Sequence, residues 1–318
     1  MRKFLLKLAY LILPLVALSY PLDYLISNAL KEDHGVHGEY EVWNAIYENK
    51  IDGDIAIYGS SRAWVQINPE ILETHLGKKV YNFGVDGHNF RIQYLRHLEY
   101  IKHNKKPHHI IVSVDAFTLQ KREDLYNQEQ FLPYMLWNKN ITEYTSSYKG
   151  FSKADYYIPF VRYAGRIATI KKANSYLLYP EEDTTNFRQK GFRSFDLQWD
   201  ASVDSLLASE KKYTIQFHSE TRTLLEYFVQ ECQRDGITVT FVYAPEYIAG
   251  QHYVVNREEA MTMYRDIAQK YSLVFLDYSN DELSFKKDFF YNASHLNTEG
   301  AQLFTEKLAQ DLKPIFKQ

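Results

Sequence analysis

Short apolar segments alternate with segments of helical periodicity along most of this chain, and that alternation constrains its fold more than any other feature. The apolar segments are predicted strands at residues 54–58, 79–82, 109–114, 238–243 and 273–276. Predicted helices follow them at residues 68–76, 91–103, 219–235, 257–271 and 298–312. Strands that alternate with helices form a parallel sheet covered on its two faces. We therefore expect an α/β fold, a three-layer α/β/α sandwich with a five-stranded parallel sheet.

The alternation is interrupted once, after the third strand. Residues 116–217 are largely polar but rich in aromatic side chains, including Trp137 and Trp199, and they contain no low-complexity run. We expect a folded insertion here. Insertions at the carboxyl ends of strands lie beside the ligand crevice of such sheets. The insertion is therefore either a lid that shapes a substrate site or packing over the sheet.

The amino terminus predicts the compartment. Basic residues at positions 2, 3 and 7 precede an uncharged, mostly apolar run over residues 8–22. Positive charge before such a run predicts a cytoplasmic amino terminus and export of the rest of the chain. We expect residues 1–30 to form an uncleaved transmembrane anchor that holds residues 31–318 on the periplasmic or extracellular side of the cell membrane. The alternative is a signal peptide cleaved after the small-x-small sequence at 17–19.

Composition excludes several classes of protein. Lys and Arg number 37 against 40 Asp and Glu, so the chain has no excess of positive charge with which to bind nucleic acid. Its single cysteine, Cys232, excludes an internal disulfide and a cysteine-clustered zinc site. We expect neither a metal nor another cofactor.

Candidate catalytic residues occur where predicted strands end. The sequence IYGSSR at residues 57–62 places Ser61 between a strand and a helix, at the carboxyl edge of the sheet. A helix amino terminus there favours negative charge. Serine is also a common cap and turn residue, so this segment alone is a weak signal.

Two further segments have the same placement. YNFGVDG at residues 81–87 runs from a strand into a turn whose glycines allow backbone amides to face a reacting oxygen. NASH at residues 292–295 puts Asn292 three positions before His295, where it could orient the imidazole ring. Each also has an ordinary structural interpretation, as a turn and as a loop histidine.

In this order the three segments resemble those of the SGNH (GDSL-type) hydrolase superfamily. The resemblance runs from about residue 54 to the carboxyl terminus, without the insertion. Its most specific parts are the Gly-Ser-Ser-Arg sequence at 59–62 and the His-Leu-Asn-x-x-Gly sequence at 295–300. The chain looks most similar to the membrane-anchored branch that acts on cell-surface polymers, such as the proteins of alginate O-acetylation and teichoic acid D-alanylation.

The resemblance implies a flavodoxin-like sheet and a set of roles. Ser61 would be the nucleophile and His295 the general base, oriented by the residue at position 292. The amides of Gly87 and Ser61 would stabilise the oxyanion, and position 115 would supply a further oxyanion donor. No cofactor is implied. The implied partners are an acylated cell-surface glycan, the membrane and a membrane-bound acyltransferase.

The sequence departs from the family pattern at two of these positions. Asn292 stands where the family has an aspartate, and Asp115 stands where it usually has an asparagine. An asparagine can hold an imidazole but cannot stabilise the imidazolium by charge, and the equivalent change in a serine protease lowers kcat about ten-thousand-fold. An ionised Asp115 would repel a developing oxyanion. Either Asp115 is protonated, or it points elsewhere, or the site is weak.

The sequence allows three hypotheses for function. The first is a serine-dependent esterase or O-acyltransferase that acts on acyl groups of an exported or cell-surface polysaccharide, with Ser61 and His295 within hydrogen-bond reach. The second is a catalytically impaired protein of the same fold, with a broken Ser–His contact, that binds surface glycan or assembles with a membrane acyltransferase. The third is a cytosolic nucleotide-binding protein, which the lack of a phosphate-loop glycine spacing disfavours.

Overall fold

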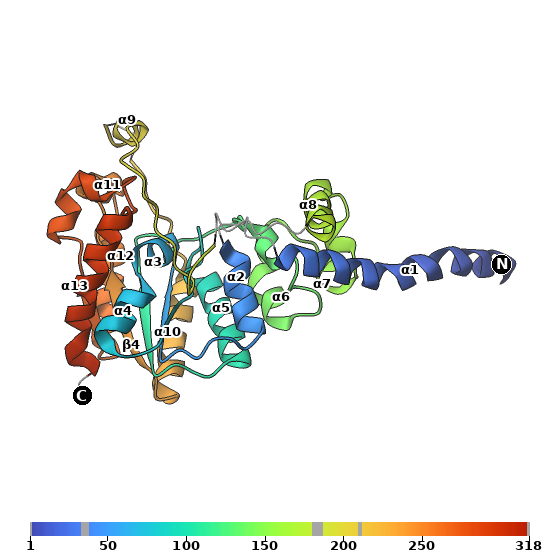
Figure 1. Cartoon of the computed structure of the whole chain (residues 1–318), viewed down its shortest axis with the longest axis horizontal. Coiled ribbons are helices and arrows are strands. Elements are labelled where there is room, and N and C mark those ends of the chain that lie inside the picture. Colours follow the sequence, from blue (N-terminus) through green and yellow to red (C-terminus); the bar gives the residue numbers. More distant parts are fainter. Residues whose placement is uncertain (1, 33–37, 180–186, 209–211, 317–318) are drawn as a thin grey trace. The chain divides into compact units, whose positions relative to one another are not determined.

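The computed structural model of the chain describes residues 2–32, 38–179, 187–208 and 212–316 (Figure 1). Contacts divide the chain into two compact units. Unit 1 comprises Met1–Asn44 and Glu123–Phe187, and unit 2 comprises Ala45–Arg122 and Arg188–Gln318. The segment predicted as one insertion, residues 116–217, is therefore shared between them.

Unit 2 contains the predicted sheet. Its strands are β1 (Ile55–Gly59), β2 (Val80–Asn82), β3 (His109–Ser113), β4 (Thr238–Tyr243) and β5 (Val274–Asp277). All four neighbouring pairs are parallel, and the order is β2-β1-β3-β4-β5. The prediction of an α/β fold with a five-stranded parallel sheet is confirmed, and the strand order is the flavodoxin-like one.

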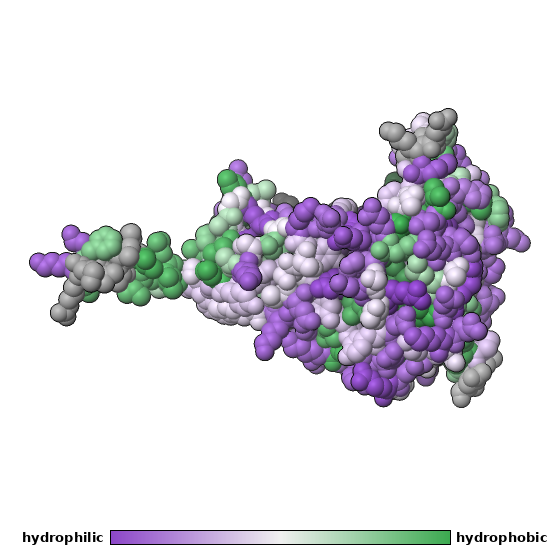
Figure 2. Space-filling model, turned by 180° about the vertical axis from the view of Figure 1, so that it is seen from behind, coloured by the Kyte–Doolittle hydropathy of each residue, from purple (hydrophilic) through white to green (hydrophobic). Residues whose placement is uncertain are grey.

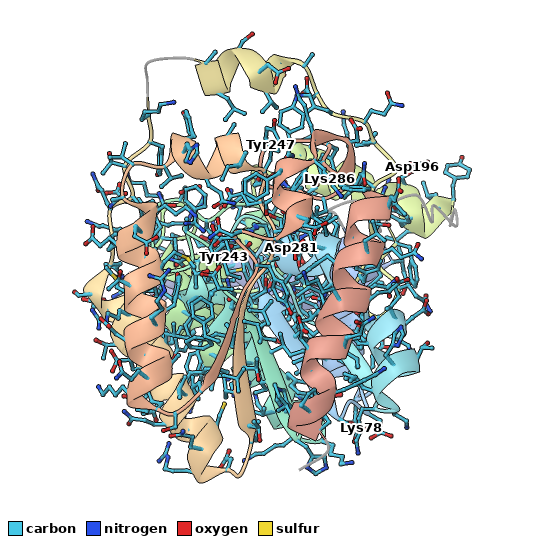
Figure 3. The ribbon with its side chains drawn as sticks, turned by 90° about the vertical axis from the view of Figure 1, so that its left-hand side faces the viewer. Lys78, Asp196, Tyr243, Tyr247, Asp281 and Lys286 are labelled. Atoms are coloured by element: carbon cyan, nitrogen blue, oxygen red, sulfur yellow. The ribbon has the colours of Figure 1, made fainter. Side chains whose placement is uncertain are left out.

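Helices cover the two faces of this sheet (Figure 3). On one face Ile55 and Ile57 join a buried cluster with side chains of three helices. These helices are α3 (Ser61–Gln66), α4 (Pro69–Leu76) and α13 (Thr298–Phe316). On the other face Tyr58 packs against Phe228 and Phe241 packs against Tyr264. The helices there are α5 (Phe90–His103), α10 (Ser219–Arg234) and α12 (Arg257–Lys270).

Shorter elements of unit 2 follow the carboxyl ends of the strands. They are α9 (Ser202–Ala208), α11 (Ile248–Tyr253), η4 (Glu282–Phe285) and η5 (Lys287–Phe289). In Figure 3, Tyr243 and Tyr247 lie near the ends of the strands, opposite Lys78. Because parallel strands end at one edge, the loops after β1, β2 and β3 meet there.

Unit 1 is helical. Its elements are α1 (Arg2–Lys31), α2 (Glu39–Tyr47, which runs into unit 2), η2 (Gln128–Phe131), α6 (Lys139–Thr145), α7 (Lys153–Tyr157), η3 (Val161–Tyr163) and α8 (Ile167–Leu178). Trp43 packs against Phe131 and Tyr134 to form its aromatic core. The predicted aromatic residue Trp137 stacks on Tyr20 within this unit.

The structure does not support the predicted transmembrane anchor. In the described parts of the chain, no helix combines the length and the apolar character that a membrane crossing requires. The apolar run contains Pro14 and Pro21. The helix then continues into the packing of unit 1, where the buried Asp23 pairs with Arg162 at 2.7 Å.

Other described side chains of α1 are exposed. Leu13, Leu15, Val16 and Leu18 each have more than half of their surface open to solvent. Figure 2 shows this apolar surface along the helix.

Candidate active site

The turn between β1 and α3 is fixed by close packing and by hydrogen bonds. A Cβ atom at Gly59 would lie 2.8 Å from the Ser113 carbonyl oxygen, closer than real Cβ contacts, so the turn needs glycine. Ser60 caps α3: its Oγ accepts from the Arg62 amide at 3.3 Å and donates to Asp115 Oδ2 at 2.5 Å. The Ser60 hydroxyl is therefore already engaged, and the next serine is the one that faces the site.

Ser61 is the first residue of α3, and its side chain meets His295. The distance from Ser61 Oγ to His295 Nε2 is 2.8 Å. The structure thus brings together two residues that are 234 positions apart in the sequence. A serine hydroxyl within hydrogen-bond reach of an imidazole is the arrangement that nucleophilic catalysis requires.

Asn292 fixes the orientation of this imidazole. Its Oδ1 accepts from the backbone amides of Ser294 and His295, each at 3.0 Å, and lies 3.0 Å from His295 Nδ1. Because backbone amides only donate, the side-chain atom that faces them is the oxygen and not the amide nitrogen. Nδ1 must then carry the proton, and the lone pair of Nε2 is left to accept from Ser61.

The imidazole is neutral at ordinary pH. Burial and the nearby Arg62 charge lower the pKa of His295 to about 3. A neutral ring is the form that can accept a proton from Ser61, but a low pKa also makes it a weak base. A carboxylate at position 292 would oppose this shift, and the amide of Asn292 cannot.

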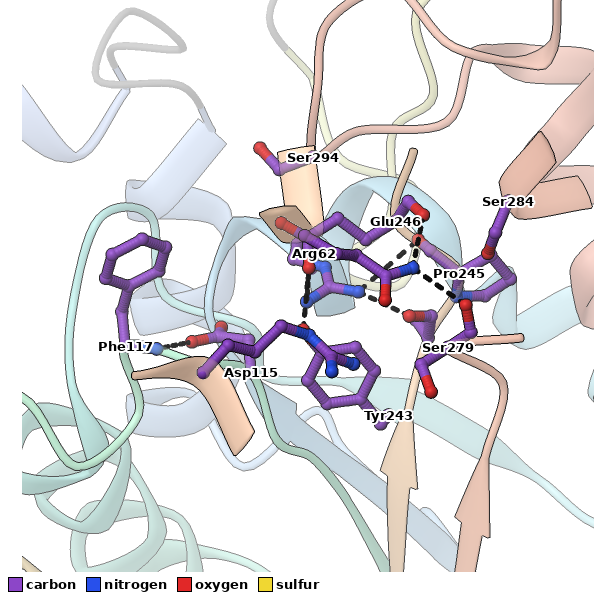
Figure 4. Close-up of polar contacts among 12 residues, drawn as sticks. Arg62, Asp115, Phe117, Tyr243, Pro245, Glu246, Ser279, Ser284 and Ser294 are labelled. Atoms are coloured by element: carbon purple, nitrogen blue, oxygen red, sulfur yellow. Dashed lines mark hydrogen bonds and ion pairs between the residues drawn. The ribbon is translucent and has the colours of Figure 1, made fainter. Parts of the chain in front are cut away.

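Arg62 is held beneath the site by a buried polar cluster (Figure 4). Its guanidinium lies over the Tyr243 ring at 4.6 Å and 3.7 Å from Glu246 Oε2. It also donates to the carbonyl oxygens of Ala244 and Pro245. Because Arg62 is almost fully buried, water screens its charge poorly and the charge acts on His295.

Asp115 does not offer a donor to an oxyanion. Its Oδ1 accepts from the Phe117 amide at 2.8 Å, and its Oδ2 accepts from Ser60 (Figure 4 shows the contact with Phe117). Both carboxylate oxygens therefore already accept hydrogen bonds from other groups of the chain. Of the alternatives raised by the sequence, the structure shows that Asp115 points elsewhere, and its contacts fix the turn that presents Ser61.

The loop after β2 lies beside this turn. The Val85 amide donates to the Gly59 carbonyl at 2.9 Å, and Gly84 packs against the backbone of Ser60 and Trp64. Gly87 has a φ of +67°, which glycine adopts without strain. Among the described residues, the amides of Gly87 and Ser61 donate no hydrogen bond, so they are free to serve an oxyanion as the resemblance implies.

A strap formed by residues 188–200, within the predicted insertion, also borders the site. The Arg193 amide donates to the Trp64 carbonyl at 3.1 Å, and the Thr298 amide donates to the Phe195 carbonyl at 3.0 Å. The strap thus joins helix α3, which carries Ser61, to the segment that carries His295. Through Phe195 it brings one aromatic ring of the predicted insertion to this edge of the sheet.

Tyr291 is a further site residue that the sequence reasoning missed. Its ring stacks on the His295 imidazole with a centroid separation of 5.4 Å and an interplanar angle of 10°. Burial, and to a lesser extent the charge of Asp86, raise the pKa of its hydroxyl. Its position directly before the NASH segment was the available signal.

Comparison with known proteins gives weak similarities. No protein-family model matches the chain, and no curated protein matches its sequence. The chain is similar to the solved structure of an acetyl xylan esterase (11% identity, TM-score 0.41, covering 81% of this chain and 99% of that one). It is also similar to a GDSL-like lipase from Bacteroides thetaiotaomicron (10% identity, TM-score 0.38, 85% and 97% covered). A third similar structure is a protein described as an acylhydrolase from Bacteroides fragilis (11% identity, TM-score 0.39, 82% and 87% covered). These TM-scores are too low to assign a family, so the chemistry has to follow from the site itself.

Proposed function

We propose that the chain is a serine-dependent esterase or O-acyltransferase. The observation that carries this proposal is the hydrogen-bonded series from Ser61 through His295 to Asn292, with contacts of 2.8 Å and 3.0 Å. The catalytically impaired alternative predicts a broken contact between serine and histidine. The intact contact therefore supports the first hypothesis.

The chemistry is an acyl transfer in two steps. Ser61 Oγ attacks the carbonyl carbon of an ester while its proton passes to His295 Nε2, and the amides of Gly87 and Ser61 stabilise the oxyanion. The imidazolium then returns the proton to the leaving alcohol, which leaves an acyl group on Ser61. Water or a sugar hydroxyl, deprotonated by the same histidine, attacks this acyl-serine and regenerates the enzyme.

Asn292 is compatible with this mechanism because of how it is held. In a serine protease the Asp-to-Asn change lowers kcat about ten-thousand-fold because the amide favours the wrong tautomer of the histidine. Here the backbone amides of Ser294 and His295 keep the Asn292 oxygen towards Nδ1, so the tautomer is the productive one. Compared with an aspartate, Asn292 still lacks the negative charge beside the His295 ring. We therefore expect a slow but active enzyme.

We further propose an acylated cell-surface polysaccharide as the substrate. The support is the resemblance of the sequence to the branch that acts on such polymers. A membrane-bound acyltransferase is the proposed partner that would supply or receive the acyl group.

A fluorophosphonate probe tests the proposed nucleophile in the full chain. We expect labelling of the wild type, and loss of labelling together with a fall of about a thousandfold or more in p-nitrophenyl acetate hydrolysis in Ser61→Ala. The matched control is Ser60→Ala, which removes the neighbouring hydroxyl and should still be labelled. If folded wild-type protein is not labelled, the proposal is wrong and the binding alternative is favoured.

A further inference from the structure

The proposed reaction creates a positive charge that the site does little to balance. When Ser61 gives its proton to His295, the ring becomes an imidazolium. Its hydrogen-bond partner at Nδ1 is the neutral Oδ1 of Asn292, and the Ser294 hydroxyl, also neutral, lies 3.2 Å from the same nitrogen. Stabilisation of the imidazolium must therefore come from a group other than a carboxylate.

Tyr291 has the geometry for this role. Its ring is almost parallel to the imidazole, and the two centroids are 5.4 Å apart. The face of an aromatic ring carries negative electrostatic potential and attracts a cation at this distance, more strongly where water is excluded. Neutral imidazole gains much less from the same face, so the contact favours the protonated form.

The Tyr291 ring is also held against rotation. Phe195 contacts it edge to face at 5.7 Å, and Phe195 in turn contacts Trp64 at 5.7 Å. The backbone of Tyr291 accepts from the Asp200 amide at 3.0 Å and donates to the His295 carbonyl at 3.1 Å. Four rings thus form a row from helix α3, which carries Ser61, to the base itself.

We propose that Tyr291 is a positioning residue that stabilises the imidazolium of His295 during acyl transfer, in place of the charge that Asn292 lacks. This inference deepens the proposed function and rests on it. According to this inference, the stacked Tyr291 ring, and not a buried acid, allows the Ser61–His295 pair to catalyse acyl transfer.

Several other charged groups act near the pair and have to be kept constant in any test. Arg62 on α3 acts directly on His295 and opposes protonation. Asp115 after β3 and Glu246 after β4 act on Arg62, and Asp86 in the loop after β2 acts on Tyr291. Variants confined to Tyr291 leave all four of these groups in place.

The test compares Tyr291→Phe, which keeps the ring, with Tyr291→Leu, which removes it, in the full chain. Both variants are made in the wild type and in Asn292→Asp, where a carboxylate should bring the His295 titration into an accessible pH range. The readouts are the acid limb of kcat/KM for p-nitrophenyl acetate and the His295 pKa from its imidazole NMR signals. Those signals are assigned by their loss in His295→Gln.

We expect Tyr291→Leu to lower kcat roughly three- to tenfold and to move the midpoint of the acid limb about 0.5 to 1 pH unit lower, with KM little changed. Tyr291→Phe should match its parent in both properties. A lower rate with an unmoved midpoint would mean that the ring only packs, and the inference would be overturned. An unchanged rate and midpoint would overturn it as well.

Two controls separate this outcome from misfolding and from failure of the proposed function. If Tyr291→Leu does not fold, Tyr291→Trp gives the opposite test, because a larger ring face should raise the His295 pKa above that of the parent. Phe117→Leu removes a comparably large ring that packs against Tyr213 instead of the imidazole, and it should leave the midpoint unmoved. If the chain proves inactive, the NMR titration still decides whether the ring shifts the His295 pKa.

Discussion

Two buried charged side chains, Asp115 and Arg62, adjoin the turn at Ser61, whereas the groups in contact with His295 are neutral. The turn that presents Ser61 rests on the Asp115 carboxylate and is followed by the buried guanidinium of Arg62. The imidazole is held by an amide oxygen, a hydroxyl and an aromatic ring. In a conventional catalytic triad the carboxylate contacts the histidine. Here the Asp115 carboxylate contacts the turn that presents Ser61.

This difference has a consequence for catalysis. A carboxylate beside Nδ1 stabilises the imidazolium in the transition state. The Asp115 carboxylate instead fixes the conformation of the turn that presents Ser61 and balances the charge of Arg62. The site is therefore well ordered but supplies a weak base. In a triad one acidic residue both orients the histidine and increases its basicity. In this chain Asn292 orients His295 without increasing its basicity, so the two properties can be changed independently.

Of the three substitutions that test this comparison, Asn292→Asp should have the largest effect, because it places a charge beside His295, where the contacting groups are neutral. We expect ester hydrolysis to rise by about tenfold or more. The carboxylate also raises the His295 pKa from its value of about 3. Activity is lost when the base is protonated, so the acid limb of kcat/KM should move to higher pH in the variant, while the wild type keeps its activity to a lower pH.

The measurement is the pH profile of p-nitrophenyl acetate hydrolysis for the two proteins, with Asn292→Ala as the control that removes orientation as well as charge. That control should be slower than the wild type. An unchanged rate in Asn292→Asp would show that another group already orients and charges the ring, and Asp288, a few residues upstream, would be the next to replace.

Part of each side of the site could be predicted from the sequence. Strand and helix periodicity predicted the sheet, and three strand-end segments, with the family resemblance they carry, brought Ser61, His295 and Asn292 together at one edge. These features are local, because each depends on a few neighbouring residues and on the rule that parallel strands end together.

The features that the sequence did not predict depend on contacts between distant segments. The direction of Asp115 is decided by Ser60, 55 positions away, and the Tyr291 ring is held by Phe195 from the strap. Asp23, which follows the amino-terminal apolar run, meets Arg162 139 positions later, and this contact draws the end of α1 into unit 1. Such pairings leave no periodic signal.

Asp115→Asn, which changes a charged group beside the Ser61 turn, should have a smaller effect than Asn292→Asp. The carboxylate accepts from Ser60 and from the Phe117 amide, and an amide side chain can satisfy only one of these contacts with its oxygen. We expect a loss of about 1–3 kcal/mol in the free energy of unfolding, because a buried donor is left without an acceptor. The rate should also fall, since Arg62 loses a balancing charge and opposes protonation of His295 more strongly.

Urea unfolding and ester hydrolysis of the same preparation measure these two effects. Asp196→Asn, at an exposed position of the strap, is the matched control and should change neither. Full stability in Asp115→Asn would contradict the role given to the carboxylate in fixing the turn.

Phe195→Ala should have the smallest effect of the three. It weakens the aromatic contact between helix α3, which carries Ser61, and Tyr291 beside His295, but it removes no group that contacts Ser61 or His295. The Phe195 ring touches Trp64 near the serine and Tyr291 beside the histidine, and aromatic contacts of this kind contribute about 0.5–1.5 kcal/mol each beyond burial. The backbone bonds of the strap to Trp64 and Thr298 do not depend on this ring. We therefore expect kcat to fall only about threefold, with Phe195→Tyr close to the wild type. A hundredfold loss, or a large rise in KM, would show that the ring contacts the substrate directly. If the rate does not change at all, the backbone of the strap alone aligns the serine with its base, and the aromatic row is not needed to join the charged side of the site to the neutral one.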